Sequence, residues 1–460
     1  MRKPTASYWW NVLHTDRMFE SVGVCLDHLG RDTRGGTMMS ASLDETVAET
    51  VGETAPFDPF ELQDTVTGDI RDPYPRMADL RRQSAIHFGN IDFTGSDDPE
   101  PPLVSEVPVP VSVFGHDEVV CALRDDRTYS STVYEGIMGV VMGPTILQMD
   151  APRHKVQRAL VSPAFRSRIL ERWETELVRS VVDDLIDAFA ARGRADLVRE
   201  LNFGFPVQVI ARILGLPMVD YPKFQEWTIG LISVASNWDR AMAASEELRV
   251  YLTAVIEQRR RQPADDLISD LVVAEIEGER LSDEDILAFL RLLLPAGVET
   301  TYRATGNLLF GLLQHPEQLE ALRNDRALFP QAFEESLRWE PPVTVILRKT
   351  LKDAVLGGVP IPANSDVGLF LGAANRDDRR YADPDTFDMF RQAQQHVGFG
   401  FGVHMCLGMH LARMEARVAV NAILDRLDDI RFDPDADDDP HIHGMAFRSP
   451  TSLPVCFSPR

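Results

Sequence analysis

A short glycine-rich run around one cysteine constrains this chain more than any other part of its sequence. The run reads Phe399-Gly400-Phe401-Gly402-Val403-His404-Met405-Cys406-Leu407-Gly408, and a helical pattern over 409–424 follows it. Glycines let a backbone turn tightly and approach a flat ligand closely, because no Cβ intervenes. A thiol at a helix N-terminus loses its proton readily, since the helix dipole favours the anion. A thiolate held in such a loop can ligate a metal, including the iron of haem.

Two simpler interpretations of this run have to be weighed beside that one. A single cysteine is most often a small buried apolar residue. Alternatively, His404, Cys406 and His410 could belong to a zinc site, although there is no clear fourth ligand and no Cys-x-x-Cys pair. The run alone leaves these alternatives open, so the other motifs of the chain have to decide.

Composition favours an ordinary globular protein in a reducing compartment. The chain has 460 residues, of which 44% are hydrophobic and 26% charged, which is typical of globular domains. Its net charge of −24 argues against a nucleic-acid partner, because phosphates attract basic proteins. The cysteines at 25, 121, 406 and 456 are scattered and show no disulfide framework.

The sequence offers no candidate for a membrane anchor. No apolar run approaches the roughly 20 residues that cross a bilayer. Arg2 and Lys3 are not followed by the clean apolar segment of a signal peptide. We therefore expect a cytoplasmic protein.

The first part of the chain reads differently from the rest. Residues 1–56 combine Gly35-Gly36 with an acidic, threonine-rich stretch over 44–54, which predicts a poorly ordered N-terminal extension. A docking arm is the alternative interpretation. Folded sequence is expected to begin near Phe57 and to continue to residue 460.

Apolar periodicity and turn residues predict a mostly helical chain. The apolar, glycine-containing segment 133–147 is expected to form a long loop, acting either as the wall of a pocket or as a buried connection. Helices are expected over 76–83, 117–123 and 283–315, and the segments 169–214 and 221–262 are expected to be mostly helical. Strands are expected over 109–114 and 452–457, and a hairpin turn over 357–362.

A cationic pair follows a predicted helix start. Asp150 could cap a helix that has Pro152 in its first turn. His154 and Arg158 are then neighbours on one face, at the i,i+4 spacing. Two cationic donors on one face suit a pair of carboxylates, although an ordinary solvated basic face would look the same.

The long helix over 283–315 contains a local defect. Pro295 and Gly297 weaken its hydrogen-bond ladder just before Glu299 and Thr300. An acid and an alcohol beside such a defect can hold water and pass protons. The alternative is an ordinary kinked helix with a surface glutamate.

Taken together, these motifs resemble those of the cytochrome P450 family. The cysteine run matches the pattern Phe-Gly-x-Gly-x-His-x-Cys-x-Gly at every fixed position. Ala296-Gly297-Val298-Glu299-Thr300 resembles the oxygen-activation motif, and Glu335-Ser336-Leu337-Arg338 resembles the Glu-x-x-Arg motif. The resemblance covers roughly residues 57–460. It implies one mainly α (α+β) domain of the cytochrome P450 fold, with a long central helix and small β-sheets.

The resemblance also implies the cofactor and its contacts. The cofactor is haem b, with Cys406 as the axial ligand of its iron. Glu299 and Thr300 would deliver protons, and Glu335, Arg338 and Arg391 would form a structural network that supports the cysteine loop. The other implied cofactor contacts are His154, Arg158, Arg348 and His404 at the propionates, and Phe399, Gly400, Ala296 and Gly297 around the ring.

The implied activity is that of a monooxygenase that inserts one oxygen atom of O2 into a C–H bond. The expected substrate is a hydrophobic small molecule, because the expected pocket residues are apolar. These pocket residues are Val140, Met142, Val343, Ile346 and Phe447.

Electrons are expected from a separate ferredoxin or flavodoxin with its reductase, because the chain ends soon after Cys406. Arg413 and Arg417 could be basic docking residues, or they could form ordinary ion pairs. A peroxide-driven haem-thiolate enzyme and a non-catalytic haem sensor or carrier remain alternatives. The peroxide-driven enzyme would not need the Glu299–Thr300 pair.

Overall fold

The computed structural model describes residues 60, 70–91, 93, 110–136, 138–235, 237–437 and 439–459. The expected extension over 1–56 lies outside the described residues. The helices are α4 (Tyr74–Gln83), α5 (His116–Arg124), α6 (Met138–Met142), α7 (Arg153–Val161), α8 (Ser167–Trp173), α9 (Arg179–Ala190), α10 (Gly204–Ile213), α11 (Tyr221–Ile232), α12 (Trp238–Arg261), α13 (Leu267–Val273), α14 (Asp283–Gln314), α15 (Pro316–Asn324), α16 (Phe329–Trp339), α17 (Leu371–Asn375) and α18 (Met409–Arg426).

The strands are short and gather mainly in two small sheets. The five-stranded sheet has the order β1-β2-β10-β7-β3, and the three-stranded sheet has the order β11-β12-β4. The strands are β1 (Ile86–Phe88), β2 (Val111–Val113), β3 (Tyr129–Ser130), β4 (Arg194–Asp196), β5 (Glu275–Ile276), β6 (Glu279–Arg280), β7 (Val345–Thr350), β8 (Ala354–Leu356), β9 (Val359–Ile361), β10 (Asp366–Phe370), β11 (Leu427–Phe432) and β12 (Pro454–Pro459).

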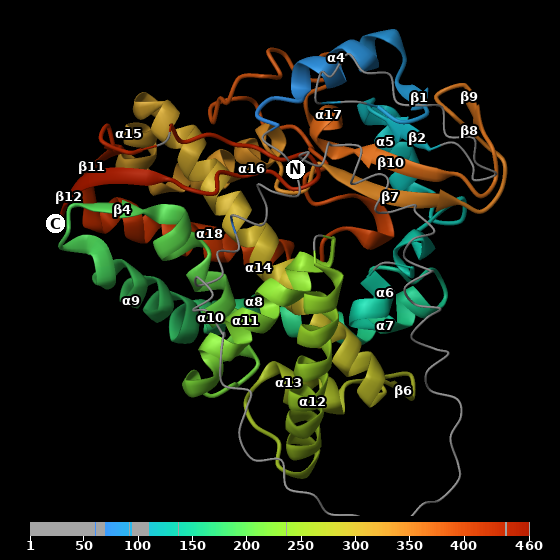
Figure 1. Cartoon of the computed structure of the whole chain (residues 1–460), viewed down its shortest axis with the longest axis horizontal. Helices are drawn as coiled ribbons and strands as arrows, with labels where there is room; N and C mark the ends of the chain where they lie inside the picture. The colour runs from blue at the N-terminus through green and yellow to red at the C-terminus, as the bar shows by residue number, and fades with distance from the viewer. Residues whose placement is uncertain are drawn as a thin grey trace, which may run out of the picture.

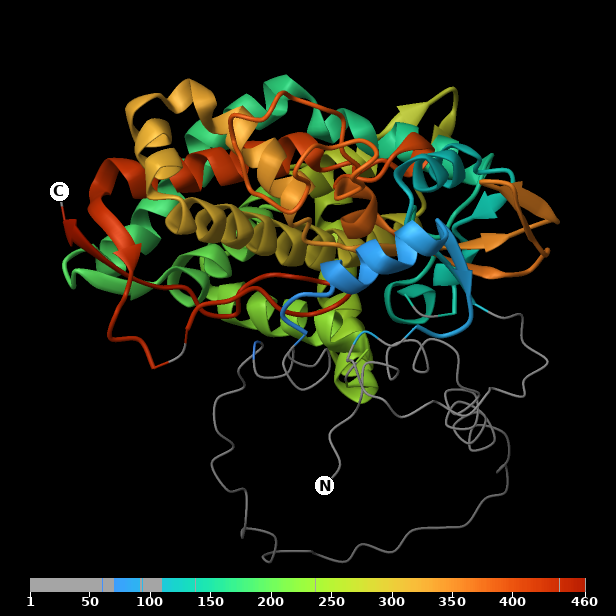
Figure 2. The same cartoon turned by 90° about the horizontal axis from the view of Figure 1, so that it is seen from above.

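The long helix α14 is the axis of the molecule. A capping box between Ser282 and Asp285 starts it, because each side chain accepts a hydrogen bond from the other residue's backbone N–H. The helix runs for 32 residues and stays continuous through Pro295. It is buried along most of its length and packs against α10, α16 and α18. Figure 1 and Figure 2 both show it crossing the centre of the fold.

The two sheets lie on opposite sides of α14 (Figure 1). In the larger sheet, β10 runs parallel to β2 and antiparallel to β7. The smaller sheet joins β4 to the C-terminal strand β12 by antiparallel pairing. The mainly α fold with small sheets is therefore confirmed.

The segment 169–214 is mostly helical, as expected, although the short strand β4 interrupts it to pair with β12. A strand of three residues is too short to leave a periodic signal. The segment 133–147 is not one long loop, because it contains the helix α6.

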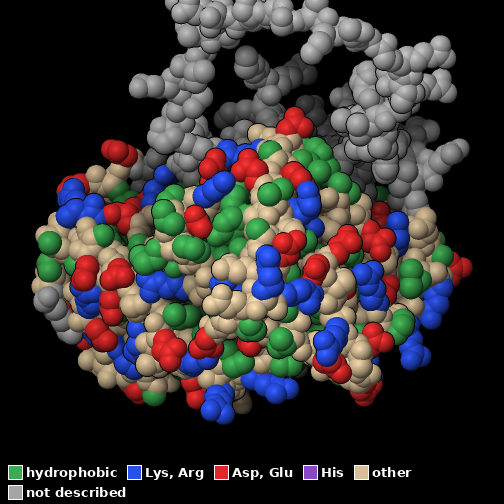
Figure 3. Space-filling model, turned by 90° about the horizontal axis from the view of Figure 1, so that it is seen from below, with side chains coloured by type: hydrophobic (Ala, Val, Ile, Leu, Met, Phe, Trp, Pro, Cys, Tyr) green, Lys and Arg blue, Asp and Glu red, His purple; other side chains and the backbone are tan. Residues whose placement is uncertain are grey.

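The surface seen from below mixes charges of both signs (Figure 3). Acidic and basic side chains alternate there, with apolar side chains between them. On this face, the net negative charge is therefore not gathered into a single acidic field. No helix within the described ranges is both long and apolar enough to cross a bilayer.

Candidate functional site

The glycine-rich run folds into a compact loop just before α18. The Cys406 N–H donates to the carbonyl of Phe399 (2.9 Å), and the Gly400 N–H donates to the carbonyl of Val397 (2.8 Å). Gly400 and Gly402 both have positive φ, +71° and +72°. A Cβ at Gly402 would lie 2.3 Å from the backbone oxygen of Leu123, whereas a Cβ at Gly400 would meet nothing within 4 Å. Gly402 therefore lets the loop touch α5, and Gly400 faces open space.

The Cys406 thiol is accessible, yet protein atoms surround it closely enough to desolvate it. Cys406 is an exposed residue, and burial nevertheless raises the pKa of its thiol. The Gly408 N–H, Arg158 and Arg413 all lower the thiol pKa, but burial outweighs them. The helix start alone therefore does not produce the expected thiolate, and a bound metal cation would supply the missing positive charge.

Two arginines and two histidines from three parts of the chain meet near this thiol. His154 and Arg158 come from α7, Arg348 from β7, and His404 from the loop itself. The rings of His154 and His404 lie 4.0 Å apart, centroid to centroid. Arg158 Nη2 donates to the carbonyl of Met405 (2.5 Å), which ties α7 to the residue before Cys406.

Arg158 and Arg348 form no ion pair within the described ranges, and the lowered pKa values of His154 and His404 keep both rings neutral at pH 7. His154 is 4% exposed and Arg348 is 5% exposed. Burial, His154, Arg348 and Arg158 together lower the pKa of His404 to about 3. His154 Nε2 is buried and has no hydrogen-bond partner in the described structure. Buried charges are normally paired, so this cluster fits an anionic ligand with two or more carboxylate oxygens.

The start of α7 differs from the prediction. Its N-cap residue is Pro152, and no side chain caps the helix. Asp150, which was expected to be the cap, instead accepts hydrogen bonds from Ser130 Oγ (2.5 Å) and from the Ser131 N–H (3.1 Å). Asp150 therefore joins α7 to β3, and His154 and Arg158 still share one face as expected.

On α14, the expected acid and alcohol have separate partners. Glu299 Oε1 lies 3.0 Å from Arg303 Nη2, one turn further along the helix. Burial raises the pKa of Glu299, and Arg303 lowers it. The Thr300 hydroxyl donates to the carbonyl of Ala296 (2.7 Å). Both side chains are thus bonded within their own helix. The carbonyl that accepts from Thr300 belongs to the residue that follows Pro295.

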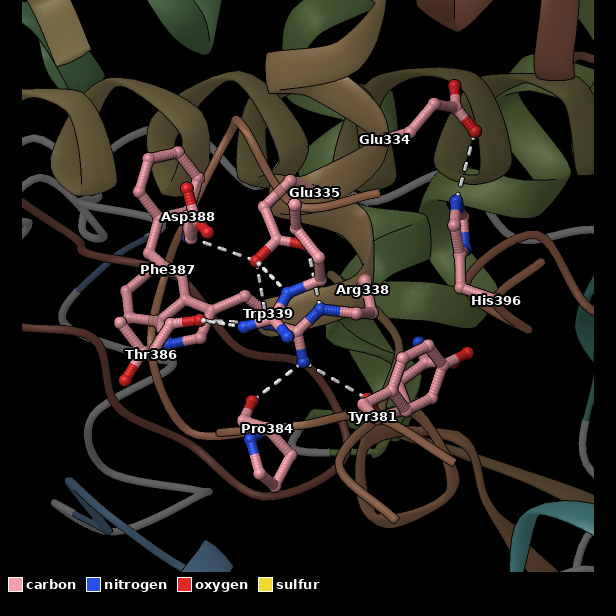
Figure 4. Close-up of polar contacts among 12 residues, drawn as sticks. Glu334, Glu335, Arg338, Trp339, Tyr381, Pro384, Thr386, Phe387, Asp388 and His396 are labelled. Carbon is pink, nitrogen blue, oxygen red and sulfur yellow. Dashed lines mark hydrogen bonds and ion pairs between the residues drawn. The ribbon is translucent and has the colours of Figure 1, made fainter. Parts of the chain in front are cut away.

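The expected structural network is assembled as the motifs indicated (Figure 4). Arg338 Nε and Nη2 donate to the two oxygens of Glu335, at 2.7 Å and 2.8 Å. Arg391 Nε donates to Glu335 Oε1 at 3.2 Å. Arg338 also donates to the carbonyls of Pro384 and Thr386, so the network fixes the segment that leads toward the cysteine loop.

Comparison with known proteins now identifies the fold family. The family model described as "Cytochrome P450" matches residues 207–455, which is more than half of the chain. The chain belongs to the cytochrome P450 family.

Relatives of known sequence agree with this membership. Cytochrome P450 107B1 of Saccharopolyspora erythraea is 40% identical over 315 residues, which cover 68% of this chain and 77% of the relative. The cytochrome P450 monooxygenase PikC of Streptomyces venezuelae is 36% identical over 79% of this chain and 85% of its own length.

Solved structures agree as well. The structure of cytochrome P450 CYP109Q5 from Chondromyces apiculatus superposes with a TM-score of 0.75 and 34% identity, over 85% of this chain and 96% of that one. CYP109E1 from Bacillus megaterium, solved in complex with testosterone, gives a TM-score of 0.74 and 30% identity, over 84% and 99% of the two chains.

Family membership establishes the class of reaction. The protein is a haem-thiolate monooxygenase that uses O2 and electrons from a redox partner and acts on small molecules. Its cofactor is haem b. This assignment replaces the zinc-site interpretation, and no group of three metal-binding side chains occurs among the described residues. It also favours a catalytic protein over a haem sensor or carrier.

The apolar residues expected around a P450 substrate are only partly brought together. Val343 pairs with Phe447 in an isolated antiparallel bridge. Ile346 is half-buried in β7, and Val140 on α6 is 51% exposed. Met142 is fully buried in the main core, and its place in the pocket stays a prediction. Its neighbour Val141 is buried too, because α6 turns that side toward the core.

The residues expected around the P450 cofactor differ in their surroundings. Ala296 is exposed on α14, and Phe399 is half-buried in the cysteine loop. A Cβ at Gly297 would lie 3.2 Å from Ile210 Cδ1, so Gly297 lets α14 approach α10. The structure thus gives Gly297 a packing contact, and its place at the cofactor stays a prediction.

The two candidate docking arginines of α18 both form ion pairs. Arg413 Nε lies 2.6 Å from Glu334 Oε1, and Arg417 Nη2 lies 2.6 Å from Glu174 Oε2. The ion-pair alternative therefore describes both side chains. Neither arginine is a free basic group for a partner.

Sequence reasoning missed several polar residues near the site. Tyr134 accepts a hydrogen bond from the Leu347 N–H (2.8 Å), next to Arg348. Glu415 on α18 is 1% exposed and lies 3.4 Å from the hydroxyl of Thr301. Burial raises the pKa of Glu415 to about 8. A signal existed for Glu415, because it occupies the same helix face as the apolar residues one turn away on either side.

Proposed function

We propose that Cys406 is the axial ligand of the haem iron and that His154, Arg158, Arg348 and His404 bind the haem propionates. One observation carries this proposal: Arg158 and Arg348 are enclosed near the thiol with no ion-pair partner among the described residues, and His154 Nε2 is a buried polar atom without a hydrogen-bond partner there. When bound, haem supplies the activation of O2 and the oxidation of the substrate. The residues of this chain hold the ring, exclude water and deliver protons.

The ligand is tested by Cys406→Ser. We expect the variant to lose the thiolate signature in the difference spectrum of the reduced protein with carbon monoxide, together with nearly all turnover. Cys121→Ser is the matched control, because Cys121 is also an exposed, unpaired cysteine. A folded Cys406→Ser protein with an unchanged spectrum would refute the assignment.

Propionate binding is tested by Arg348→Gln. Arg348 is the most enclosed arginine of the cluster and has no ion-pair partner among the described residues. Removing its charge should weaken haem retention, measured as the ratio of haem to protein after gel filtration. Arg153→Gln serves as control, because Arg153 pairs with Asp285 outside the cluster. An unchanged ratio of haem to protein in Arg348→Gln would show that Arg348 does not bind a propionate.

We propose that Glu299 and Thr300 deliver protons to the oxygen side of the haem. Two features support this: the Glu299 side chain is mostly enclosed on α14, and the Thr300 hydroxyl beside it bonds to a helix carbonyl. Glu299 would have to leave Arg303 to hand a proton toward Thr300. General acid–base assistance of this kind contributes on the order of 100- to 10,000-fold.

We propose a hydrophobic small molecule as substrate. Val343, Ile346 and Phe447 are apolar and are not fully buried. Relatives act on such molecules: one is named vitamin D(3) 25-hydroxylase, from Pseudonocardia autotrophica, and one solved relative holds testosterone. Titration with a panel of steroids, terpenoids, fatty acids and polyketides, followed by the haem absorption spectrum, tests the class. A response confined to polar compounds would contradict it.

We propose that a ferredoxin or flavodoxin supplies the electrons by docking against the cysteine loop. Arg124 at the end of α5 is exposed and lies over the ring of Phe401, 4.7 Å from its centroid. Arg124→Glu should slow reduction by an acidic carrier protein and leave reduction by dithionite unchanged. Arg261→Glu, on the remote end of α12, is the control.

A cytoplasmic location fits, because Cys121, Cys406 and Cys456 are all unpaired.

A further inference from the structure

A partly exposed ion pair joins α16 to α18 next to the cysteine loop. Glu334 Oε1 accepts from Arg413 Nε (2.6 Å), and Glu334 Oε2 accepts from Arg413 Nη2 (2.9 Å). The two bonds form a bidentate fork, which fixes both side chains in one geometry. Glu334 immediately precedes Glu335 of the structural network, so the same turn of α16 serves both contacts.

His396 holds the other side of the same carboxylate. His396 Nε2 lies 3.0 Å from Glu334 Oε2, as Figure 4 shows. His396 Nδ1 accepts the Gly398 N–H (3.0 Å), so Nε2 carries the hydrogen that points to Glu334. Glu334 thus links His396, which precedes the cysteine loop, to Arg413 on α18, which follows the loop.

Arg413 reaches the loop through an aromatic face. Its guanidinium carbon lies 4.5 Å from the centroid of the Phe399 ring. The carbonyl of Phe399 in turn accepts the Cys406 N–H (2.9 Å). The positive charge of Arg413 is therefore held against the same residue that fixes the backbone of the ligand.

The charge of Arg413 lies against the cysteine loop, because its guanidinium packs on the Phe399 ring. Arg413 and His396 in turn hold the pKa of Glu334 at about 2, so the carboxylate stays ionised at neutral pH. The pair consists of a fixed cation on the loop side and a fixed anion behind it.

We propose that the Glu334–Arg413 pair sets the reduction potential of the haem iron, by holding one positive charge against the cysteine loop and one negative charge behind it. Reduction adds an electron to the iron–thiolate unit, so a nearby cation favours the reduced state and a nearby anion disfavours it. Both residues are positioning residues, because they act through the cysteine loop. The inference rests on the proposed role of Cys406 as the iron ligand.

The decisive experiment measures the reduction potential of the haem-loaded protein in two charge-removing variants. Arg413→Gln leaves Glu334 unpaired and should make the potential more negative than in the native protein. Glu334→Gln leaves Arg413 unneutralised and should make it more positive. The double variant removes both charges and should return close to the native value. Structural damage alone would move both single variants in the same direction.

Further variants separate charge from packing. Arg413→Lys keeps the cation and should restore most of the native potential, whereas a purely geometric role for the fork would not be rescued by lysine. Arg417→Gln is the matched control, because Arg417 forms a 2.6 Å ion pair with Glu174 one turn further along α18 and is similarly exposed. It should leave the potential unchanged.

The outcomes also distinguish this inference from the ligand assignment. If the native protein lacks the thiolate signature with carbon monoxide, Cys406 is not the ligand and the proposed function fails. If the signature is present but the two single variants shift alike, or shift no more than Arg417→Gln does, the electrostatic role of the pair is overturned.

Discussion

Glu299 and Thr300 are neighbours in sequence, yet each side chain bonds to a different part of α14. Thr300 donates to the Ala296 carbonyl, and Glu299 pairs with Arg303. Thr300→Ala removes only the hydroxyl. We expect product formed per electron consumed to fall more than electron consumption itself, because reduced oxygen then escapes as peroxide. Measuring product, peroxide and reductant together checks this, and unchanged coupling would argue against the relay.

Glu415 shows how one buried carboxyl can impose a pH dependence on the whole fold. Its pKa is raised from 4.5 to about 8, and Thr301 is its only described hydrogen-bond partner. Between these values the folded protein keeps the proton that the unfolded chain releases. Stability should therefore fall as pH rises through this range, by at most about 1.4 kcal/mol per pH unit.

The variant Glu415→Gln removes this titration. We expect it to unfold with less pH dependence between about pH 5 and about pH 8, and to be more stable than the native protein near pH 8. Chemical denaturation of the haem-loaded protein at several pH values measures both effects. The exposed Glu320→Gln is the control. An equal pH slope in the native and Glu415→Gln proteins would show that Glu415 does not titrate as described.

At the scale of elements, the cysteine loop depends on one close contact with α5. Gly402 has φ of +72°, and an added Cβ would lie 2.3 Å from the Leu123 backbone oxygen. Gly402→Ala should displace the loop and reduce both haem retention and the thiolate signature. Gly358→Ala is a matched control, because Gly358 has φ of +81° and open space around an added Cβ.

The two glycine variants share the cost of a left-handed alanine, about 1–2 kcal/mol. Only Gly402→Ala adds a collision with backbone, which cannot move as a flexible side chain can. If both variants kept the native spectrum, the contact between the loop and α5 would not be needed to hold the ligand.

At the scale of the whole molecule, a buried charge network joins distant parts of the chain. Arg448 is 1% exposed and donates to Glu340 Oε1 (2.8 Å) and to the carbonyls of Ile70 and Arg71. Tyr74 donates to the same Glu340 oxygen (2.5 Å). The network therefore connects the start of α4, the end of α16 and the C-terminal segment.

Breaking this network should destabilise the fold as a whole. Arg448→Met leaves Glu340 buried with weaker compensation, because Arg376 is its remaining cation at 3.4 Å. We expect the free energy of unfolding to fall by roughly 3–5 kcal/mol, as for other broken buried pairs. The exposed Arg431→Met should change it by less than about 0.5 kcal/mol. Equal effects in denaturant titrations would mean that the buried network adds no stability.

The sequence by itself determined the features that depend on short spacing. The cysteine run, the long helix with its defect, the pairing of Glu335 with Arg338 and the shared face of His154 and Arg158 follow from residues within one or two helical turns. Local backbone geometry specifies such contacts, so a pattern in the sequence is enough to predict them.

Only the tertiary structure decided which of these local features meet. The folded chain places Arg348 and His404 near His154, and it pairs Arg413 with Glu334. It also buries Glu415 against Thr301 and pairs β4 with β12. These contacts join residues far apart in the chain. Their formation depends on which face of each helix the core covers and on how the sheets pair, and no local pattern carries that information.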